Sequence, residues 1–231
     1  MIARLDERER LESVLRGHDV IIHLAAAQHE AQAPESHFHK VNVEGTRTLL
    51  ELAERCGVRR FVHGSSIGVY GSVANGELHA DSPLAPDNHY GRTKAEAERL
   101  VREFASRMET CIVRISEVYG PGDMRLLKLF RAIERGRYVT IGAGRNEHQL
   151  IFVDDVARGL LAAARAERAA GETLVLAGGE RLTTDEMASA IGAAVGRQRR
   201  LHHVPIVPFD IAARFFEATF PRLYGDRKSV V

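Results

Sequence analysis

A tyrosine and a lysine four residues apart, Tyr90 and Lys94, are the side chains whose types and spacing best fit acid–base chemistry. Residues at this spacing are neighbours on one face of a helix. A free phenol has a pKa of about 10, too high for a general base at neutral pH, but a nearby cation stabilises the phenolate and lowers that pKa. The pair could therefore move a proton on or off a hydroxyl group during hydride transfer. The spacing alone is common, and the start of an ordinary surface helix is the alternative interpretation.

Two serines upstream of this pair, Ser65 and Ser66, add hydroxyl groups to the same candidate site. They follow the run Arg60-Phe61-Val62-His63, for which we expect a buried strand. Hydroxyls at the carboxyl end of a strand in an open α/β sheet lie where ligands bind. Ser66 could therefore hydrogen-bond a substrate oxygen beside Tyr90.

The glycines of segment 64–71, Gly-Ser-Ser-Ile-Gly-Val-Tyr-Gly, resemble a phosphate-binding loop. Such a loop needs a helix N-terminus immediately after it to receive the phosphate. Residues 73–86 instead contain an Asn-Gly pair and two prolines, without an apolar stripe, so we expect a loop and no phosphate site there. No glycine turn precedes the helix expected at Asp6 either. We therefore expect this sequence to lack the phosphate-binding unit of a dinucleotide site.

The elements that must position these side chains alternate between short apolar strands and amphipathic helices. Strands are expected at residues 20–24, 60–63, 111–115 and 138–141, and helices at 43–56, 90–108 and 125–135. Three further helices are indicated by caps at Asp6, at Asp154 or Asp155, and at Thr183 with Glu186. Strands this apolar are typical of a parallel sheet buried on both faces. The fold class is therefore predicted to be α/β, a Rossmann-like doubly wound parallel sheet.

Composition limits the class of protein. The chain has 231 residues, 45% of them hydrophobic, and a net charge of +1, which argues against a nucleic-acid or membrane surface. Two separate cysteines, Cys56 and Cys111, fit core positions and a reducing compartment better than a disulfide scaffold. The charged stretch Arg4–Arg10 does not fit a signal peptide, and no apolar run is long enough to span a membrane. We therefore expect a cytoplasmic protein.

The histidines and acidic pairs do not indicate a metal site. His37-Phe38-His39 and His202-His203 lack a carboxylate or cysteine at ligand spacing. Asp154-Asp155 is expected to cap a helix rather than to bind a cation. His23 and His63 end buried strands and are expected to be hydrogen-bonded neighbours of the site.

Six short motifs occur in order along the chain. They are Val-Ile-Ile-His-Leu-Ala-Ala (20–26), Val-Asn-Val-Glu-Gly-Thr (41–46), Phe-Val-His-Gly-Ser-Ser-Ile-Gly-Val-Tyr-Gly (61–71), Tyr-Gly-Arg-Thr-Lys-Ala-Glu (90–96), Val-Arg-Ile-Ser-Glu-Val-Tyr-Gly-Pro-Gly (113–122) and Ile-Phe-Val-Asp-Asp-Val-Ala (151–157). Together they resemble the NAD-dependent epimerase/dehydratase family, a branch of the extended short-chain dehydrogenases/reductases. The resemblance covers about Asp6 to Pro208.

This resemblance implies a role for each matching position. Tyr90 would be the catalytic base, Ser66 the catalytic Ser/Thr, and Lys94 would hold the nicotinamide ribose of NAD or NADP. Substrate contacts are implied for Ser66, Glu117 and His148. Tyr90 would also contact the cofactor, and the other positions that would do so are Leu24, Ala25, Ala26, Asn42, Ser65 and Ser116.

Two departures from the family pattern leave the substrate open. Many family members that act on nucleotide sugars carry Asn at the position of Glu117, and some carry a phosphate-binding Arg where His148 stands. A glutamate beside a diphosphate is repulsive unless it is paired. A nucleotide sugar is therefore one alternative, and an uncharged alcohol or ketone is the other. Epimerisation, dehydration and reduction share the same first step and stay open as well.

The resemblance also implies the organisation of the chain. Residues 1–120 would form a partial, N-terminally truncated dinucleotide-binding Rossmann domain. Residues 121–231 would form mainly a substrate-binding lobe, with some segments returning to the first domain. A homodimer through the helices at 43–56 and 90–108 is implied. Because the family's glycine-rich turn precedes the helix at Asp6, the alternative function is a truncated or degenerate, non-catalytic family member, at most a binding protein.

Overall fold

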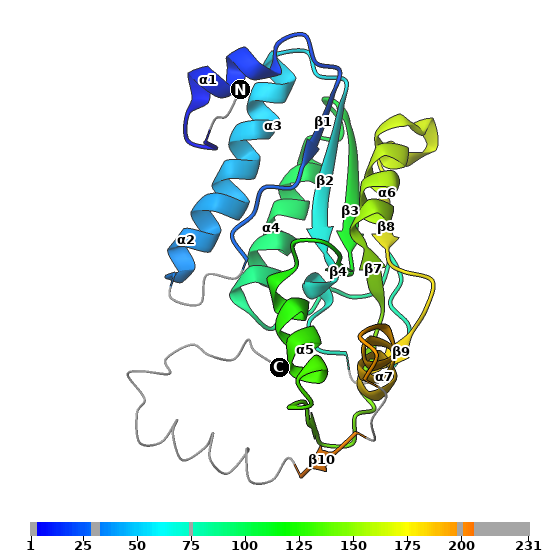
Figure 1. Cartoon of the computed structure of the whole chain (residues 1–231). Helices are drawn as coiled ribbons and strands as arrows, with labels where there is room; N and C mark the ends of the chain where they lie inside the picture. Colours follow the sequence, from blue (N-terminus) through cyan, green and yellow to red (C-terminus); the bar gives the residue numbers. More distant parts are fainter. Residues whose placement is uncertain (1–3, 29–32, 74–75, 198–200, 206–231) are drawn as a thin grey trace. The chain divides into compact units, whose positions relative to one another are not determined.

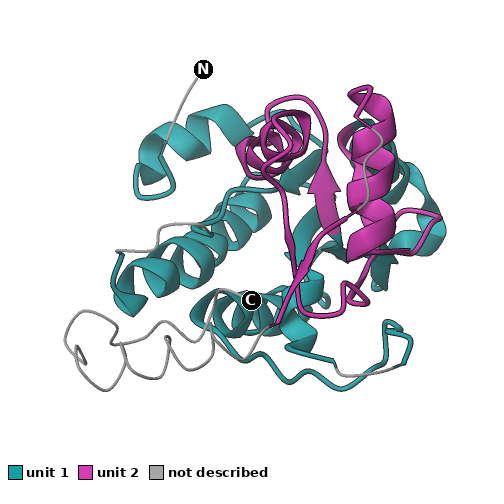
Figure 2. Cartoon of the chain, turned by 60° about the horizontal axis from the view of Figure 1, so that its bottom comes forward, with its two compact units in different colours: residues 1–116, 154–176 teal, residues 117–153, 177–231 magenta. Residues whose placement is uncertain are grey.

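The computed structural model describes residues 4–28, 33–73, 76–197 and 201–205. The chain divides into two compact units, coloured separately in Figure 2. Unit 1 comprises residues 1–116 and 154–176, and unit 2 comprises residues 117–153 and 177–231. Pro208, at which the family resemblance ends, lies outside the described residues.

Unit 1 is built on a four-stranded parallel sheet with the strand order β1-β2-β3-β8 (Figure 1). This is the predicted Rossmann-like α/β fold. The strands of the sheet are β1 (Val20–His23), β2 (Arg60–Ser66), β3 (Glu109–Ile115) and β8 (Thr173–Leu176). The helical segments are α1 (Arg8–Leu15), α2 (Glu35–His39), the π-helix η1 (Lys40–Glu44), α3 (Gly45–Arg55), the 3-10 helix η2 (Ile67–Tyr70), α4 (His89–Glu103), α6 (Val153–Arg165) and the 3-10 helix η3 (Glu167–Ala169).

Side chains along β2 alternate between the two faces of the sheet, as strand geometry requires. Phe61 packs into an apolar core formed with α1, α3 and α4. His63 and Ser65 lie at the same alternation and contact side chains of α4. Arg60 faces the other way, where its guanidinium donates to the carbonyl oxygen of Ala163 in α6 at 3.1 Å. The sheet is thus covered by α3 and α4 on one face and by α6 on the other (Figure 1).

Helix α4 begins close to the end of β2 for two local reasons. The Asn88 side chain caps the helix by accepting a hydrogen bond from the backbone N–H of Gly91 at 2.8 Å. A Cβ atom at Gly91 would lie 2.4 Å from the carbonyl oxygen of Gly68, so only glycine allows this approach to η2. The first turn of α4, which carries Tyr90, is therefore held beside the residues that follow β2.

The described part of unit 2 contains three two-stranded pairings and two helices. β4 (Glu117–Tyr119) pairs parallel with β7 (Leu150–Phe152), β10 (His203–Val204) pairs parallel with β5 (Thr140–Ile141), and β6 (Glu147–His148) pairs antiparallel with β9 (Leu182–Thr183). Helices α5 (Met124–Glu134) and α7 (Thr184–Ala194) pack around Ile133, Met187 and Ile191. The predicted capping box of Thr183 and Glu186 is confirmed at the start of α7.

Two of the predicted helix caps are wrong. The N-cap of α1 is Glu7, and the carboxylate of Asp6 instead accepts a hydrogen bond from the Arg4 side chain at 3.2 Å. Asp154-Asp155 lies within the first turn of α6, after its start at Val153, so neither residue is the cap. Both carboxylates still stabilise the helix, because negative charge is favourable near a helix N-terminus.

Two helix boundaries also differ from the prediction. The helix expected from Val43 is preceded by helical residues from Glu35 onward, which form α2 and η1. The helix expected to reach Met108 ends at Glu103, because the chain must turn before β3 begins at Glu109, earlier than predicted. Met108 still packs into the core, but from the turn rather than from the helix.

The glycine-rich segment 64–71 is part of β2 followed by the short η2, and the next helix is α4. The described residues between Gly71 and Asn88 contain no helix. This agrees with the loop predicted from the Asn-Gly pair and the two prolines of residues 73–86. No helix of the described part of the chain is long and apolar enough to cross a membrane.

Candidate active site

The structure brings Tyr90 and Ser66 together, although they lie on different elements. Tyr90 is in the first turn of α4, and its hydroxyl is hydrogen-bonded with that of Ser66 at the end of β2. Ser66 Oγ also accepts a hydrogen bond from the backbone N–H of Gly68 at 3.1 Å. Burial raises the pKa of Tyr90 above 10.0, and the bond to Ser66 acts in the opposite direction. The lowered pKa expected for Tyr90 is therefore not seen, because loss of hydration outweighs the stabilisation of the phenolate.

Lys94 lies one helical turn after Tyr90 and is almost fully buried, with 2% of its surface exposed. Its ammonium group donates to the carbonyl oxygen of Gly64 at 2.7 Å and lies 3.3 Å from Nε2 of His63. Burial lowers the pKa of Lys94 from 10.5 to about 8, and the nearby carboxylate of Glu98 opposes this shift. Lys94 is thus a cation held from the β2 side by two acceptors.

The loop after β1 carries three of the predicted cofactor residues. Leu24, Ala25 and Ala26 are exposed there, and Leu24 has 53% of its surface accessible. The carboxyl end of a parallel strand is where open α/β sheets bind ligands. These residues are therefore placed where a ligand of unit 1 can reach them.

Asn42 anchors this loop to α4. Its Oδ1 accepts from the backbone N–H of Ala27 at 2.8 Å, and its Nδ2 donates to the Ala27 carbonyl oxygen at 3.0 Å. The same Nδ2 donates to Oγ1 of Thr93 at 3.0 Å, next to Lys94. Asn42 lies in the π-helix η1, a type of irregularity that is frequent at functional sites. Both amide hydrogens of Asn42 are thus used to hold the protein's own backbone and α4 in place.

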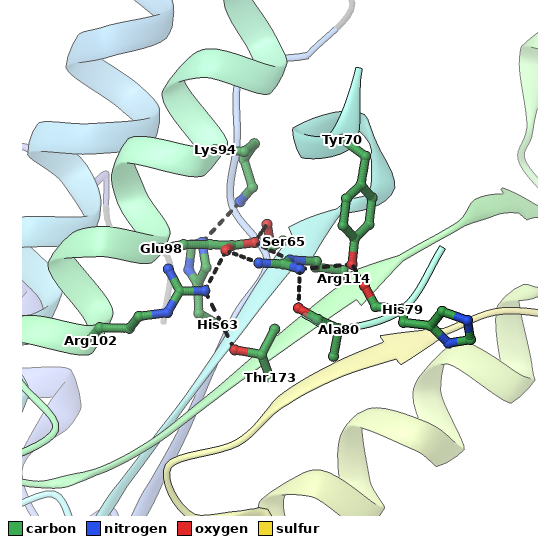
Figure 3. A network of polar contacts seen from close by, with 10 residues as sticks. All are labelled: His63, Ser65, Tyr70, His79, Ala80, Lys94, Glu98, Arg102, Arg114 and Thr173. Carbon is green, nitrogen blue, oxygen red and sulfur yellow. Dashed lines mark hydrogen bonds and ion pairs between the residues drawn. The ribbon is translucent and has the colours of Figure 1, made fainter. Parts of the chain in front are cut away.

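Ser65 opens a buried polar network beneath the site, drawn in Figure 3. Its hydroxyl donates to Oε1 of Glu98 at 2.7 Å. Glu98 is fully buried and receives two hydrogen bonds from Arg114, Nε to Oε1 at 2.9 Å and Nη2 to Oε2 at 2.8 Å. Arg102 donates to Oε2 as well, at 2.8 Å. Burial alone would raise the pKa of Glu98, but the hydrogen bonds from Arg114 and Ser65 outweigh it and lower that pKa.

Arg114 extends the network to the loop that precedes α4. Its Nη1 donates to the hydroxyl oxygen of Tyr70 at 2.7 Å and to the carbonyl oxygen of Ala80 at 2.8 Å. The Tyr70 hydroxyl in turn donates to the carbonyl oxygen of His79 at 2.7 Å. The ion pair of Glu98 and Arg114 thereby connects side chains of β2, β3, α4 and η2 with the loop at residues 79–80 (Figure 3).

Sequence reasoning misses Glu98 and Arg114, although a signal for each is present. Glu98 follows Lys94 at the spacing by which Lys94 follows Tyr90, so all three share one face of α4. Arg114 stands in the otherwise apolar stretch of residues 111–115 in β3, and a buried cation requires a partner. The two signals together predict an ion pair between strand and helix.

Ser116 belongs to unit 1, whereas the predicted substrate residues Glu117 and His148 belong to unit 2. Ser116 is buried at the end of unit 1, where its backbone N–H donates to the carbonyl oxygen of Leu176 at 3.0 Å. In unit 2, Glu117 Oε2 lies 3.1 Å from Nδ1 of His148. The other ring nitrogen of His148 lies 3.1 Å from Oγ1 of Thr184. Glu117 is therefore paired with His148. The repulsion of a diphosphate that was expected for an unpaired Glu117 does not apply to this arrangement.

The charges of this pair reinforce each other. The hydrogen bond with His148 lowers the pKa of Glu117, and the same bond raises the pKa of His148. In both cases burial acts in the opposite direction and is outweighed. The pair therefore favours a carboxylate next to an imidazolium.

Within residues 4–28, 33–73, 76–197 and 201–205, no group of three or more His, Cys, Asp or Glu side chains could hold a metal ion.

His23 and His63 differ in how completely their rings are hydrogen-bonded. His23 has a partner, because its Nε2 lies 2.9 Å from Oγ1 of Thr46. His63 is hydrogen-bonded as expected through Nε2, which lies 3.3 Å from the ammonium nitrogen of Lys94, but its Nδ1 is buried without a partner.

The sequence matches a known family and a curated enzyme. A sequence model described as the NAD dependent epimerase/dehydratase family matches residues 2–177. The dTDP-glucose 4,6-dehydratase of Streptomyces niveus is 33% identical over 211 residues, which are 87% of this chain and 62% of that protein. The chain spans 50% and 62% of the length of the first curated relatives that it matches.

Solved structures with bound ligands show the same fold. A double mutant of DesIV, a dTDP-glucose 4,6-dehydratase from Streptomyces venezuelae solved with NAD and DAU bound, matches with a TM-score of 0.74 and 30% identity. The match covers 88% of this chain and 66% of that one. MoeE5 in complex with UDP-glucuronic acid and NAD matches with a TM-score of 0.77 and 29% identity, over 89% of this chain and 71% of that chain.

Proposed function

Since the chain belongs to the NAD-dependent epimerase/dehydratase family, we propose that it binds NAD and acts on the sugar of a nucleotide sugar by hydride transfer. Tyr90 serves as the acid–base group of this reaction. The observation that carries the proposal is the convergence of Tyr90, Ser66 and Lys94 at the carboxyl end of β2. The family supports the reaction class, and the geometry supports the choice of these residues.

The residues of unit 1 fit a nicotinamide cofactor. An ammonium group has three hydrogens, and two of those on Lys94 are directed at Gly64 and His63. One donor therefore remains for a ribose hydroxyl. The exposed residues 24–26 provide apolar surface at the end of β1, and the buried Ser116 lies at the end of β3. Bound NAD would supply the hydride acceptor and, when oxidised, a positive charge on its ring.

Tyr90 moves the proton in this proposal. When a sugar hydroxyl is oxidised, the Tyr90 hydroxyl oxygen takes the proton of that hydroxyl, and Ser66 orients the oxygen from which it leaves. The raised pKa of Tyr90 means that the neutral phenol predominates in the structure as it stands. Positive charge arriving near the phenol favours the phenolate, as does the hydrogen bond from Ser66. A neutral phenol is the form required for the reverse proton transfer, to a keto oxygen.

Unit 2 is proposed to contact the substrate through Glu117 and His148. Their ion pair replaces a bare carboxylate with a nearly neutral pair, which removes the repulsion of a substrate phosphate. The relatives named above act on dTDP-glucose or bind UDP-glucuronic acid, which supports a nucleotide sugar over a simple alcohol. The product analysis described below distinguishes an epimer from a dehydrated sugar.

The remaining parts of the proposal concern organisation. Unit 1 is proposed to hold the dinucleotide and unit 2 the sugar. A homodimer through α3 and α4 is proposed as well, which light scattering can test. Cys56 and Cys111 are free thiols, which supports a cytoplasmic location.

Calorimetry and turnover assays test the function directly. The 231-residue chain is titrated with NAD and then incubated with dTDP-glucose, UDP-glucose or UDP-glucuronic acid, with products separated by chromatography. We expect NAD binding and conversion of one of these sugars. Tyr90→Phe should abolish turnover while NAD still binds, and Tyr138→Phe, in the core of unit 2, is the matched control.

Each contrary outcome has a definite meaning. Turnover that survives in Tyr90→Phe overturns the acid–base assignment. NAD binding without conversion of any sugar favours a binding protein, and the absence of both NAD binding and turnover refutes the proposed function of this chain.

A further inference from the structure

His63 is a buried histidine with an unusual hydrogen-bonding position. It lies in β2 with 0% of its surface exposed, and its Nε2 is 3.3 Å from the ammonium nitrogen of Lys94. Its Nδ1 is the one buried side-chain nitrogen or oxygen without a hydrogen-bond partner in the part of the chain that the structure describes. Buried polar groups are normally satisfied, so an exception requires an explanation.

The protonation of the ring follows from its surroundings. Burial, and then the charge of Lys94, lower the pKa of His63 well below 6.5, so the ring is neutral at neutral pH. A neutral imidazole has one N–H and one acceptor nitrogen, whereas an ammonium group can only donate. Nε2 must therefore accept from Lys94, and Nδ1 must carry the hydrogen. The contact that Nε2 makes with Lys94 thus places the hydrogen of the ring on Nδ1, the nitrogen that has no acceptor.

The neighbouring ring of His23 does not provide an acceptor for Nδ1 of His63. The centroid of the His23 ring lies 5.4 Å from that of His63. The Thr46 hydroxyl donates its only hydrogen to the carbonyl oxygen of Asn42 at 2.7 Å, so it accepts from Nε2 of His23. His23 is therefore held as the opposite tautomer, with its hydrogen on Nε2. Burial and the charge of Lys94 lower its pKa to about 3, so it adds no positive charge beside Lys94.

We propose that His63 is a positioning residue for Lys94, which fixes the direction of the ammonium group by accepting one of its hydrogens. The Gly64 carbonyl oxygen accepts the second hydrogen from the adjacent position of β2. With both fixed, the third hydrogen has one direction left. The inference rests on the proposed function in one respect, namely that the third hydrogen of Lys94 binds the ribose of NAD.

The groups that face Lys94 come from three elements. His63 lies on β2 and His23 on β1, while Glu98 lies one turn further along α4 and opposes the lowering of the Lys94 pKa. An apolar residue at position 63 would remove one acceptor and leave the burial unchanged. The charged form of Lys94 would then be less stable, and its pKa would fall below about 8.

Nuclear magnetic resonance tests the tautomer without any need for activity. Chains labelled with 15N-histidine are recorded at neutral pH by long-range proton–nitrogen correlation, and the signals of His63 are assigned by their loss in His63→Gln. We expect a neutral ring with the hydrogen on Nδ1. A ring with the hydrogen on Nε2, or an imidazolium, overturns the proposal.

The pKa of Lys94 provides the second measurement. The sequence contains only four lysines, Lys40, Lys94, Lys128 and Lys228, so their side-chain carbon signals can be followed separately. His63→Leu should lower the pKa of Lys94, whereas His63→Gln should keep it near the wild-type value, because the amide oxygen can accept in place of Nε2. His18→Leu, at an exposed position, should have no effect.

Binding assays separate this proposal from the proposed function. His63→Leu should weaken NAD binding by roughly tenfold to a hundredfold, the effect of one hydrogen bond to a charged group, and His63→Gln should restore most of it. If NAD does not bind even the wild type, the function fails, but the tautomer and the Lys94 pKa still decide the role of His63. If NAD binds and His63→Leu changes neither the Lys94 pKa nor the affinity, the positioning role is refuted.

Discussion

Replacing Glu98 by glutamine should destabilise unit 1 strongly, because it leaves the guanidinium of Arg114 without its counter-ion. The two side chains are 0% and 2% exposed, so water cannot replace the lost charge. A glutamine amide keeps one acceptor oxygen, but its NH₂ group would face the guanidinium, which only donates. The Ser65 hydroxyl and Arg102 lose part of their partner as well.

The expected magnitude follows from the burial. Removing one partner of a buried ion pair costs about 3–5 kcal/mol, mainly because the remaining charge is left uncompensated. For a chain of this size each kcal/mol lowers the melting temperature by about 2–4 °C. We therefore expect a fall of roughly 6–20 °C for the transition of unit 1.

The same helix offers a matched control. Glu103 pairs with Arg99 at 2.8 Å, with both side chains about half exposed. A solvent-exposed pair at this helical spacing contributes only about 0.3–0.5 kcal/mol. Glu103→Gln should therefore change the melting temperature by no more than about 2 °C.

Thermal and urea unfolding, followed by circular dichroism, measure both variants. A destabilisation by Glu98→Gln as small as that of Glu103→Gln would refute the reasoning. A double variant, Glu98→Leu with Arg114→Met, provides a further check, because replacing both charges by apolar groups should cost less than removing one. A double variant that is less stable than Glu98→Gln would show that the network contributes more than charge compensation.

Three further predictions concern other parts of the chain. Gly71→Ala should destabilise more than Gly57→Ala by chemical denaturation, because both glycines have a positive φ but only at Gly71 would a Cβ meet a carbonyl oxygen, at 2.0 Å; equal effects would contradict this. The raised pKa of His148 stabilises unit 2 below pH 6.5 and the lowered pKa of Glu117 stabilises it above pH 4.5, so the pair contributes most between these values. That contribution is lost as the pH rises through the folded pKa of His148, and His148→Gln should abolish this pH dependence in unfolding experiments. Thr183→Ala should cost about 1 kcal/mol through the loss of the capping box at α7, and an unchanged urea midpoint would argue against that role.

The family and the fold class could be read from the sequence because they depend on local patterns. Apolar strands alternating with amphipathic helices predict the parallel sheet, and the capping box of Thr183 and Glu186 marks the start of α7. The face shared by Tyr90 and Lys94 follows from helical periodicity alone. The errors at Asp6 and Met108 arise where a nearby ion pair or the next strand decides the boundary.

The partners of the site residues could not be read from the sequence, because they are set by contacts between distant segments. Glu117 and His148 lie 31 residues apart, and only the fold of unit 2 makes a repulsive carboxylate into half of an ion pair. The direction of the Tyr90 pKa depends on how deeply the ring is buried, which its spacing from Lys94 does not reveal. Sequence thus determined which groups share a helix face or a strand end. Tertiary packing decided their hydration and their counter-charges, and these set the protonation on which acid–base chemistry depends.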